Sequence, residues 1–203
     1  MAKKKGYHHG DLRRALLDAG LKILVKQGPE GITLRELARR AGVTHAAPYR
    51  HFADKEALLA AVAEEGFRAM GRKMDERRAL AGGDAARTLH ELGVGYVLFA
   101  VEHPAHFKVM FGREISDFEK YPGLHEEAEA TFERLVAAIT ALQQGGQVRP
   151  GDPMPVALTC WSMVHGLATL YTAGRLGELA REPEGIANAA SRLLLDGVLA
   201  RKR

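Results

Sequence analysis

The chain has 203 residues, of which 46% are hydrophobic and 27% are charged, and its formal net charge is +4. These proportions are typical of folded globular proteins and exclude a disordered or collagen-like chain. The single cysteine excludes an internal disulfide and a cysteine-built zinc or iron–sulfur site, and it favours a reducing, cytoplasmic location. The first residues are basic but lack the apolar segment of a secretion signal.

Residue usage favours helices over strands. The sequence contains 32 Ala and 25 Leu but only 12 Val and five Ile. Ala and Leu lose little side-chain freedom in a helix, whereas the branched residues suit strands. No segment alternates between apolar and polar residues with a period of two, so the expected fold class is all-α.

Positive charge is concentrated at one end of the chain. Residues 1–55 contain 12 Lys and Arg against five Asp and Glu, whereas residues 56–203 contain 17 against 20. A basic quarter joined to a mildly acidic remainder suits a protein that approaches a polyanion with one end only.

Four helices are predicted in this basic region and just beyond it, over about 11–27, 33–42, 45–51 and 55–81. The first has apolar residues at helical spacing and ends at Gly28, which a proline follows. The second begins at Thr33, where Glu36 is placed to complete a capping box, and ends at Gly42. The fourth follows Asp54, a favourable N-cap.

Two short helices joined by a glycine-containing turn, beside a longer first helix, are typical of a helix-turn-helix. The expected recognition helix is the segment over about 45–51. Ala46 is small enough to sit close to base edges, while Tyr49 and Arg50 have longer reach. Pro48 has no amide hydrogen and disfavours helical geometry at Ala47, so we expect an irregular first turn.

The segments TLRELARRAGVT, at residues 33–44, and YRHFADKEAL, at residues 49–58, resemble the DNA-binding signature of TetR-type transcriptional regulators. The resemblance extends over about residues 11–65. It implies phosphate contacts from Thr33, Tyr49 and Lys55. It also implies that a second set of residues lies on the side facing the DNA groove, namely Arg35, Thr44, His45, Ala46 and Arg50.

Five further helices are predicted over about 84–102, 105–112, 125–144, 155–173 and 184–200, which brings the total to about nine. The segment 153–174 contains no Asp, Glu, Lys or Arg. Its Ser, Thr and His residues and the lack of companion spans favour a helix buried between protein surfaces over a membrane span. We therefore expect a helix-turn-helix domain at 1–55 and a helical ligand-sensing and dimerisation domain at 56–203.

The segment around Trp161, His165 and Gly166 resembles the Trp-His-Gly type of C-terminal domain found in one branch of the TetR family. The resemblance implies a homodimer built from the last two helices of each subunit, which spaces two recognition helices along a double-stranded DNA operator. The apolar helix over 155–173 favours the same arrangement, because one chain of this size offers little surface to cover it.

The resemblance also implies that a small-molecule effector binds in the core of the second domain. The candidate residues are aromatic, histidine or methionine side chains on the helices of that domain, namely Tyr96, Phe99, His103, Phe107, Met110, Trp161 and His165. Aromatic residues at helical spacing are often ordinary core residues, so both interpretations stay open.

Other functions have weaker support in the sequence. His103 and His106 have a ligand-like spacing, but Pro104 interrupts the helix and no metal motif is complete. No enzyme motif is present and Cys160 is the only thiol, so we expect neither a cofactor nor catalysis. The sequence therefore predicts a ligand-responsive transcriptional regulator, most simply a repressor. The alternative is a non-specific architectural DNA-binding protein.

Overall fold

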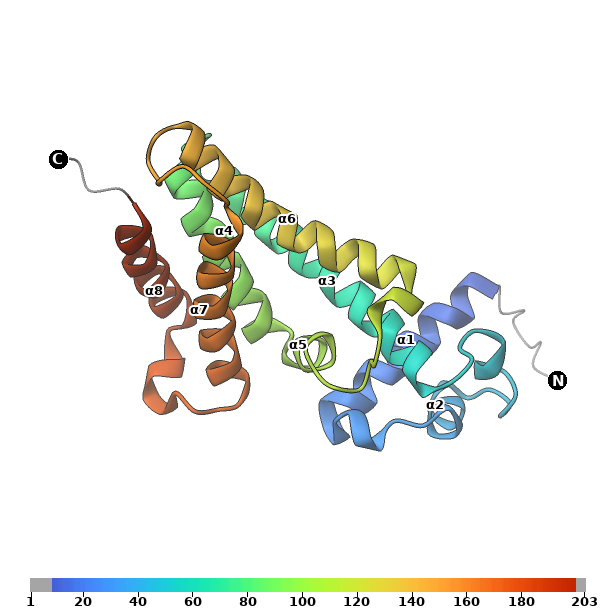
Figure 1. Ribbon diagram of the computed structural model, residues 1–203. Coiled ribbons are helices and arrows are strands. Elements are labelled where there is room, and N and C mark those ends of the chain that lie inside the picture. Colours follow the sequence, from blue (N-terminus) through green and yellow to red (C-terminus); the bar gives the residue numbers. More distant parts are fainter. Residues whose placement is uncertain (1–8, 200–203) are drawn as a thin grey trace. The chain divides into compact units, whose positions relative to one another are not determined.

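The computed structural model describes residues 9–199, and this part of the chain is all-α (Figure 1). It contains eight α-helices: α1 (His9–Gln27), α2 (Leu34–Ala41), α3 (Lys55–Ala79), α4 (Ala85–Glu102), α5 (Pro104–Met110), α6 (Pro122–Gln144), α7 (Met154–Thr172) and α8 (Pro183–Val198). Four short 3₁₀ helices complete it: η1 (Pro29–Gly31), η2 (Pro48–Arg50), η3 (Phe118–Lys120) and η4 (Gly177–Arg181). The eight α-helices correspond to eight of the predicted ones. The ninth, over 45–51, is a turn followed by η2.

The chain divides into two compact units. Among the described residues, the N-terminal unit comprises residues 9–65 and the segment Ala105–Leu124, and the C-terminal unit comprises Gly66–Pro104 and residues 125–199. The division of the chain into a DNA-binding domain at 1–55 and a second domain at 56–203 stays a prediction.

In the N-terminal unit, α1 packs against α2 and the start of α3. Gly20 of α1 lies at the centre of this packing, because a Cβ atom there would lie 3.6 Å from the side chain of Ile32 and 3.7 Å from those of Leu37 and Leu58. All three of these side chains are fully buried. Burial of one stripe from each helix thus holds α2 and the following segment on a rigid base.

In the C-terminal unit, α4 packs against both α7 and α8 (Figure 1). Two glycines of α4 allow close approaches, one to α8 and one to α3. A Cβ atom at Gly93 would lie 2.9 Å from Oγ of Ser191 on α8, and one at Gly95 would lie 3.1 Å from the backbone Cα of Met74 on α3. Helix α4 is therefore enclosed by its neighbours on more than one side.

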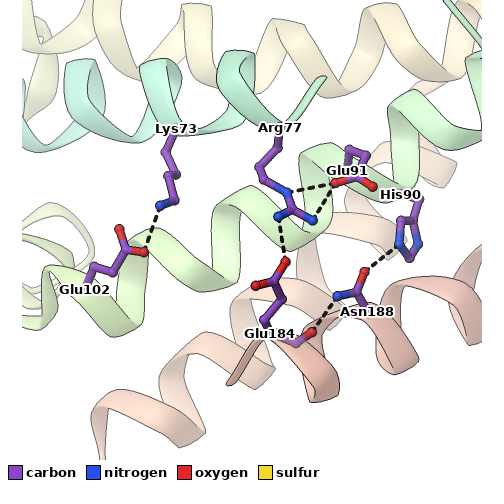
Figure 2. A network of polar contacts seen from close by, with 7 residues as sticks. All are labelled: Lys73, Arg77, His90, Glu91, Glu102, Glu184 and Asn188. Carbon is purple, nitrogen blue, oxygen red and sulfur yellow. Dashed lines mark hydrogen bonds and ion pairs between the residues drawn. The ribbon is translucent and has the colours of Figure 1, made fainter. Parts of the chain in front are cut away.

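A polar network joins three helices of the C-terminal unit (Figure 2). Arg77 of α3 donates from Nε to the carboxylate of Glu91 on α4 at 2.8 Å, and from Nη1 to Glu184 on α8 at 2.6 Å. Between α4 and α8, Nε2 of His90 lies 2.9 Å from Oδ1 of Asn188. These bonds fix α8 relative to α3 and α4.

The described helices include none that is both long and apolar enough to cross a membrane.

Candidate functional site

Helix α2 has a defined start and end. The Thr33 hydroxyl accepts a hydrogen bond from the backbone amide of Glu36 at 3.1 Å, as the predicted capping box requires. Gly42 adopts the left-handed conformation, with φ of 67°, and the amide of Val43 then bonds back to the carbonyl of Ala38 at 3.0 Å. This glycine-dependent ending turns the chain sharply toward the recognition segment.

The recognition segment, residues 44–51, is held by a series of short-range backbone bonds. The amide of Ala47 bonds to the carbonyl of Thr44 at 3.0 Å, that of Arg50 to Ala47 at 3.3 Å, and that of His51 to Pro48 at 2.9 Å. Each bond joins residues three apart, which is the 3₁₀ pattern rather than the α pattern. The prediction of an irregular first turn is confirmed.

The prediction for Ala47 itself is wrong. Its backbone angles, φ of −62° and ψ of −44°, are helical despite the following proline. Pro48 occupies the first position of η2, where the lost amide would have no helical partner in any case, and its ring is buried. The proline therefore changes the hydrogen-bond pattern of the segment and not the conformation of the residue before it.

Helix α3 begins at Lys55, directly after the recognition segment. The Asp54 carboxylate accepts from the backbone amide of Ala57 at 2.8 Å and caps this helix. Lys55 is half-buried at its first position. Phe52 is 3% exposed, and the guanidinium carbon of Arg13 lies 5.6 Å from the centre of its ring.

The remaining candidate DNA-binding residues are all exposed, namely Thr33, Arg35, Thr44, His45, Ala46, Tyr49 and Arg50. Tyr49 has 59% of its surface exposed. Three of these residues, Thr33, Arg35 and His45, line one surface hollow together with Glu36 and Arg39. The structure thus gathers part of the predicted set around a single depression between α2 and the recognition segment.

Sequence reasoning missed a charged cluster at this hollow. Both carboxylate oxygens of Glu36 accept bonds from the guanidinium of Arg39, each at 2.7 Å, and one of them also accepts from Nε of Arg40 at 2.7 Å. These bonds lower the pKa of Glu36 to about 2. The capping-box prediction assigned this carboxylate to the helix start. Two cationic side chains at i+3 and i+4 hold it instead, and one of them does so through a bidentate guanidinium–carboxylate pair, in which both partners are charged.

Three of the candidate effector residues meet in the C-terminal unit. Nε1 of Trp161 donates to the hydroxyl of Tyr96 at 3.2 Å, and that hydroxyl lies 2.8 Å from Nδ1 of His165. Tyr96 is 4% exposed, and burial raises its pKa well above the usual range. Burial also lowers the pKa of His165, so its imidazole is neutral at pH 7. Phe132 of α6, which was not among the candidate effector residues, packs edge-on against Trp161, with ring centres 5.8 Å apart.

The other candidate effector residues lie elsewhere. Phe99 is 1% exposed and lies beside His103, with ring centres 5.0 Å apart, in the C-terminal unit. Phe107 and Met110 belong to the N-terminal unit, where both are buried and Phe107 packs on Phe111. The structure thus brings Tyr96 together with its two α7 partners but assigns the seven candidates to two units.

The chemistry of Cys160 offers no activated nucleophile. Its side chain is buried, and burial raises the pKa of the thiol to about 11, so it stays protonated near neutral pH. Among residues 9–199, no group of three or more His, Cys, Asp or Glu side chains is arranged to hold a metal ion.

Comparisons with known proteins match both parts of the chain. Two curated transcriptional regulators are similar to part of the chain. AcrR of Shigella flexneri is 34% identical over 92 residues, which cover 45% of this chain and 43% of the relative. The class C tetracycline repressor of Escherichia coli is 48% identical over 52 residues, which cover 26% of this chain and 24% of the relative. As with two regulators of Pseudomonas putida, the match spans less than half of the relative's own length.

Solved structures match over nearly the whole chain. A protein of unknown function from Rhodococcus sp. RHA1 is 34% identical with a TM-score of 0.83, over 97% of this chain and all of that one. A tetR-family regulatory protein from Rhodococcus RHA1 has the same fold at 21% identity, with a TM-score of 0.76 over 94% of this chain and 98% of that one.

Two family profiles match the sequence itself. The profile for bacterial regulatory proteins of the tetR family matches residues 16–62, and the profile for the C-terminal domain of tetracycline-repressor-like proteins matches residues 89–194. The second match alone covers more than half of the chain, so this protein belongs to the TetR family of bacterial regulatory proteins.

Proposed function

We propose that this protein is a transcriptional repressor that binds a palindromic DNA operator as a homodimer and responds to a small-molecule effector. The observation that carries the proposal is the exposed set of polar and basic residues between the start of α2 and the start of α3. These residues are placed on a rigid helical base and belong to the segment that matches the tetR-family profile.

The geometry of this surface supports DNA binding. Thr33 and Lys55 lie at the starts of α2 and α3, where backbone amides and the helix dipole favour a phosphate. Between them, the recognition segment carries exposed Tyr49 and Arg50 next to the small residue Ala46. We assign phosphate contacts to Thr33, Tyr49 and Lys55. We assign the groove-facing side to Arg35, Thr44, His45, Ala46 and Arg50.

The exposed face of α7 supports a homodimer. This helix contains no charged residue, yet one line of its residues at intervals of four is exposed, namely Leu158, Ser162, Gly166 and Leu170. Leu158 and Leu170 are each nearly half exposed, and a Cβ atom at Gly166 would meet nothing within 4 Å. A face of this composition lets a second helix approach closely while it covers the two leucines.

Helix α8 offers a matching line. Gly185, Ala189 and Leu193 are exposed at the same interval, and Leu193 has 73% of its surface exposed. We infer that α7 and α8 of two subunits pack as a four-helix bundle, so that each dimer presents two recognition segments to two half-sites.

The hydrogen-bonded cluster of Tyr96, Trp161 and His165 supports an effector site in the C-terminal unit. It combines polar groups with aromatic rings, which suits a largely apolar molecule with one polar group. We include Phe99, His103, Phe107 and Met110 among the candidate effector residues. Packing alone also explains the three buried side chains of this set, Phe99, Phe107 and Met110, whereas His103 is exposed.

Selection of DNA fragments from a random pool by the purified protein tests the proposal. We expect a palindromic site whose half-sites are about one helical turn apart, bound about 10³-fold or more tightly than random DNA. Nearly equal affinity for selected and random DNA would favour a non-specific architectural protein instead. Fluorescence of Trp161, the only tryptophan, then provides a screen for molecules that bind the C-terminal unit and release the operator.

A further inference from the structure

The cluster formed by Glu36, Arg39 and Arg40 lies on the proposed DNA-binding surface. Glu36 and Arg39 line the same hollow as Thr33, Arg35 and His45. Arg39 has 69% of its side chain exposed, whereas the side chains of Glu36 and Arg40 are each only 24% exposed. A carboxylate therefore sits among the basic groups that would face the phosphates.

The bond geometry shows how firmly the arginines are held. Arg39 pairs through Nε and Nη2 with the two oxygens of Glu36, which is the bidentate arrangement of a guanidinium and a carboxylate. A phosphate uses the same two-pronged face of the guanidinium. Arg39 cannot bind the Glu36 carboxylate and a phosphate through that face at the same time. Glu36 lies on the preceding turn of the same helix, so it always competes with phosphate for Arg39.

Helix α2 does not depend on this cluster for its formation. The helix is capped by the Thr33 hydroxyl and closed by Gly42, and its inner face buries Leu34, Leu37 and Ala38. Ion pairs at the i+3 and i+4 positions add only a small amount to helix stability. A purely structural role thus leaves unexplained why one carboxylate at the hollow binds two basic side chains, of which Arg39 also lines the hollow.

We propose that Glu36 is a specificity-determining residue, which holds Arg39 and Arg40 away from DNA phosphates and so limits binding to random sequences. The proposal rests on the proposed DNA-binding function and deepens it. With the carboxylate present, three charged side chains contribute a net charge of +1 to the surface, and affinity depends more on the recognition segment. Without it, two guanidinium groups become available to any phosphate.

The test is the salt dependence of binding to a random DNA duplex, measured for the full-length wild type and Glu36→Gln between about 50 and 200 mM salt. Each additional phosphate contact steepens the slope of log K against log salt by about 0.9. We expect Glu36→Gln to steepen it by about one to two per subunit and to lower the ratio of operator to random-DNA affinity. An unchanged slope would overturn the proposal.

Two controls separate this effect from a general gain of positive charge. Glu178→Gln in η4 raises the net charge by the same amount and releases Arg181, which the Glu178 carboxylate contacts at 2.7 Å. Unlike Glu36, Glu178 lies in the C-terminal unit. We expect no change of slope there. Glu36→Gln combined with Arg39→Ala and Arg40→Ala should return to the wild-type slope. If the salt slope of the triple variant stays as steep as that of Glu36→Gln, the Glu36 carboxylate acts by repelling phosphates directly and the proposal fails.

The single variant Arg39→Ala keeps the proposal testable if Glu36→Gln folds poorly. Because Arg39 is already held by Glu36, its removal should leave the slope on random DNA unchanged. A slope that becomes shallower by about 0.9 per subunit would show that Arg39 contacts a phosphate in the wild type and would overturn the proposal. A wild type that binds no duplex would instead refute the proposed function itself.

Discussion

Arg77 is the side chain whose loss should cost the C-terminal unit most among its polar groups. It joins Glu91 and Glu184 in the network of Figure 2, and its own side chain is only 17% exposed. Glu91 is 12% exposed, so in Arg77→Ala its carboxylate stays largely out of water without its guanidinium partner. Breaking a fully buried pair costs about 3–5 kcal/mol, and the residual exposure here reduces the expected loss to about 2–3 kcal/mol.

The second partner of Arg77 provides the matched comparison. Glu184 is 56% exposed, so water replaces the lost bond in Glu184→Gln and the expected cost is below about 1 kcal/mol. For a chain of this size, these values correspond to a decrease in Tm of about 4–12 °C for Arg77→Ala and of about 4 °C or less for Glu184→Gln. Urea unfolding followed by circular dichroism measures both, at one fixed protein concentration because the proposed dimerisation would contribute to stability.

A double variant tests whether the cost arises from the stranded carboxylate. Replacing both partners of a buried pair by apolar side chains of similar size is often neutral, so Arg77→Met with Glu91→Met should recover most of the stability. Equal losses in Arg77→Ala and Glu184→Gln, or a double variant less stable than Arg77→Ala, would refute the reasoning.

Three further predictions concern the proposed DNA, dimer and effector regions. Lys55→Ala should weaken binding to operator and random DNA alike and flatten the slope of log K against log salt by about one per subunit. Arg50→Ala should instead cost about 1–3 kcal/mol of binding free energy on the operator and little on random DNA. Equal losses of affinity on both DNAs would make Arg50 a backbone contact. Leu158→Asp and Leu193→Asp should each give monomers by sedimentation and lose operator binding, and a monomeric wild type at micromolar concentration would contradict this. Because burial lowers the pKa of His165 below its usual 6.5, unfolding free energy should fall as the pH drops below about 6.5, and His165→Gln should reduce that fall.

The helices were predictable because their ends carry local signals. Thr33 and Gly42 bound α2 through a side-chain cap and a left-handed glycine, and both interactions involve only residues within one or two turns. Asp84 likewise caps α4 by accepting from the amide of Arg87 at 2.8 Å. Helix α6 begins at Pro122, three residues before the predicted start, because proline is well suited to the first position of a helix.

The polar contacts between helices were not predictable. Arg77 and Glu184 are 107 residues apart in the sequence and have no spacing that suggests a pair. The same is true of Tyr96 and His165, whose side chains meet only because α4 packs against α7. At the proposed DNA-binding surface, the spacing of Glu36 and Arg39 was visible, but a capping box and an ion pair compete for the same carboxylate, and only the side-chain positions decide between them.

Helix α4 joins the features that an effector-controlled regulator needs. Its residue Tyr96 carries the buried hydroxyl of the proposed effector cluster, while at Gly93 and Gly95 a Cβ atom would lie only 2.9 Å from Oγ of Ser191 on α8 and 3.1 Å from Cα of Met74 on α3. Because Tyr96 is 4% exposed and is bonded to Trp161 and His165 of α7, an effector that inserts beside it would have to displace these α7 side chains. Since α7 and α8 carry the proposed dimer face, such a displacement would change how two subunits meet. An effector that binds one dimer geometry more tightly than another shifts the population toward it, and that difference in affinity sets the limit on its control of DNA binding.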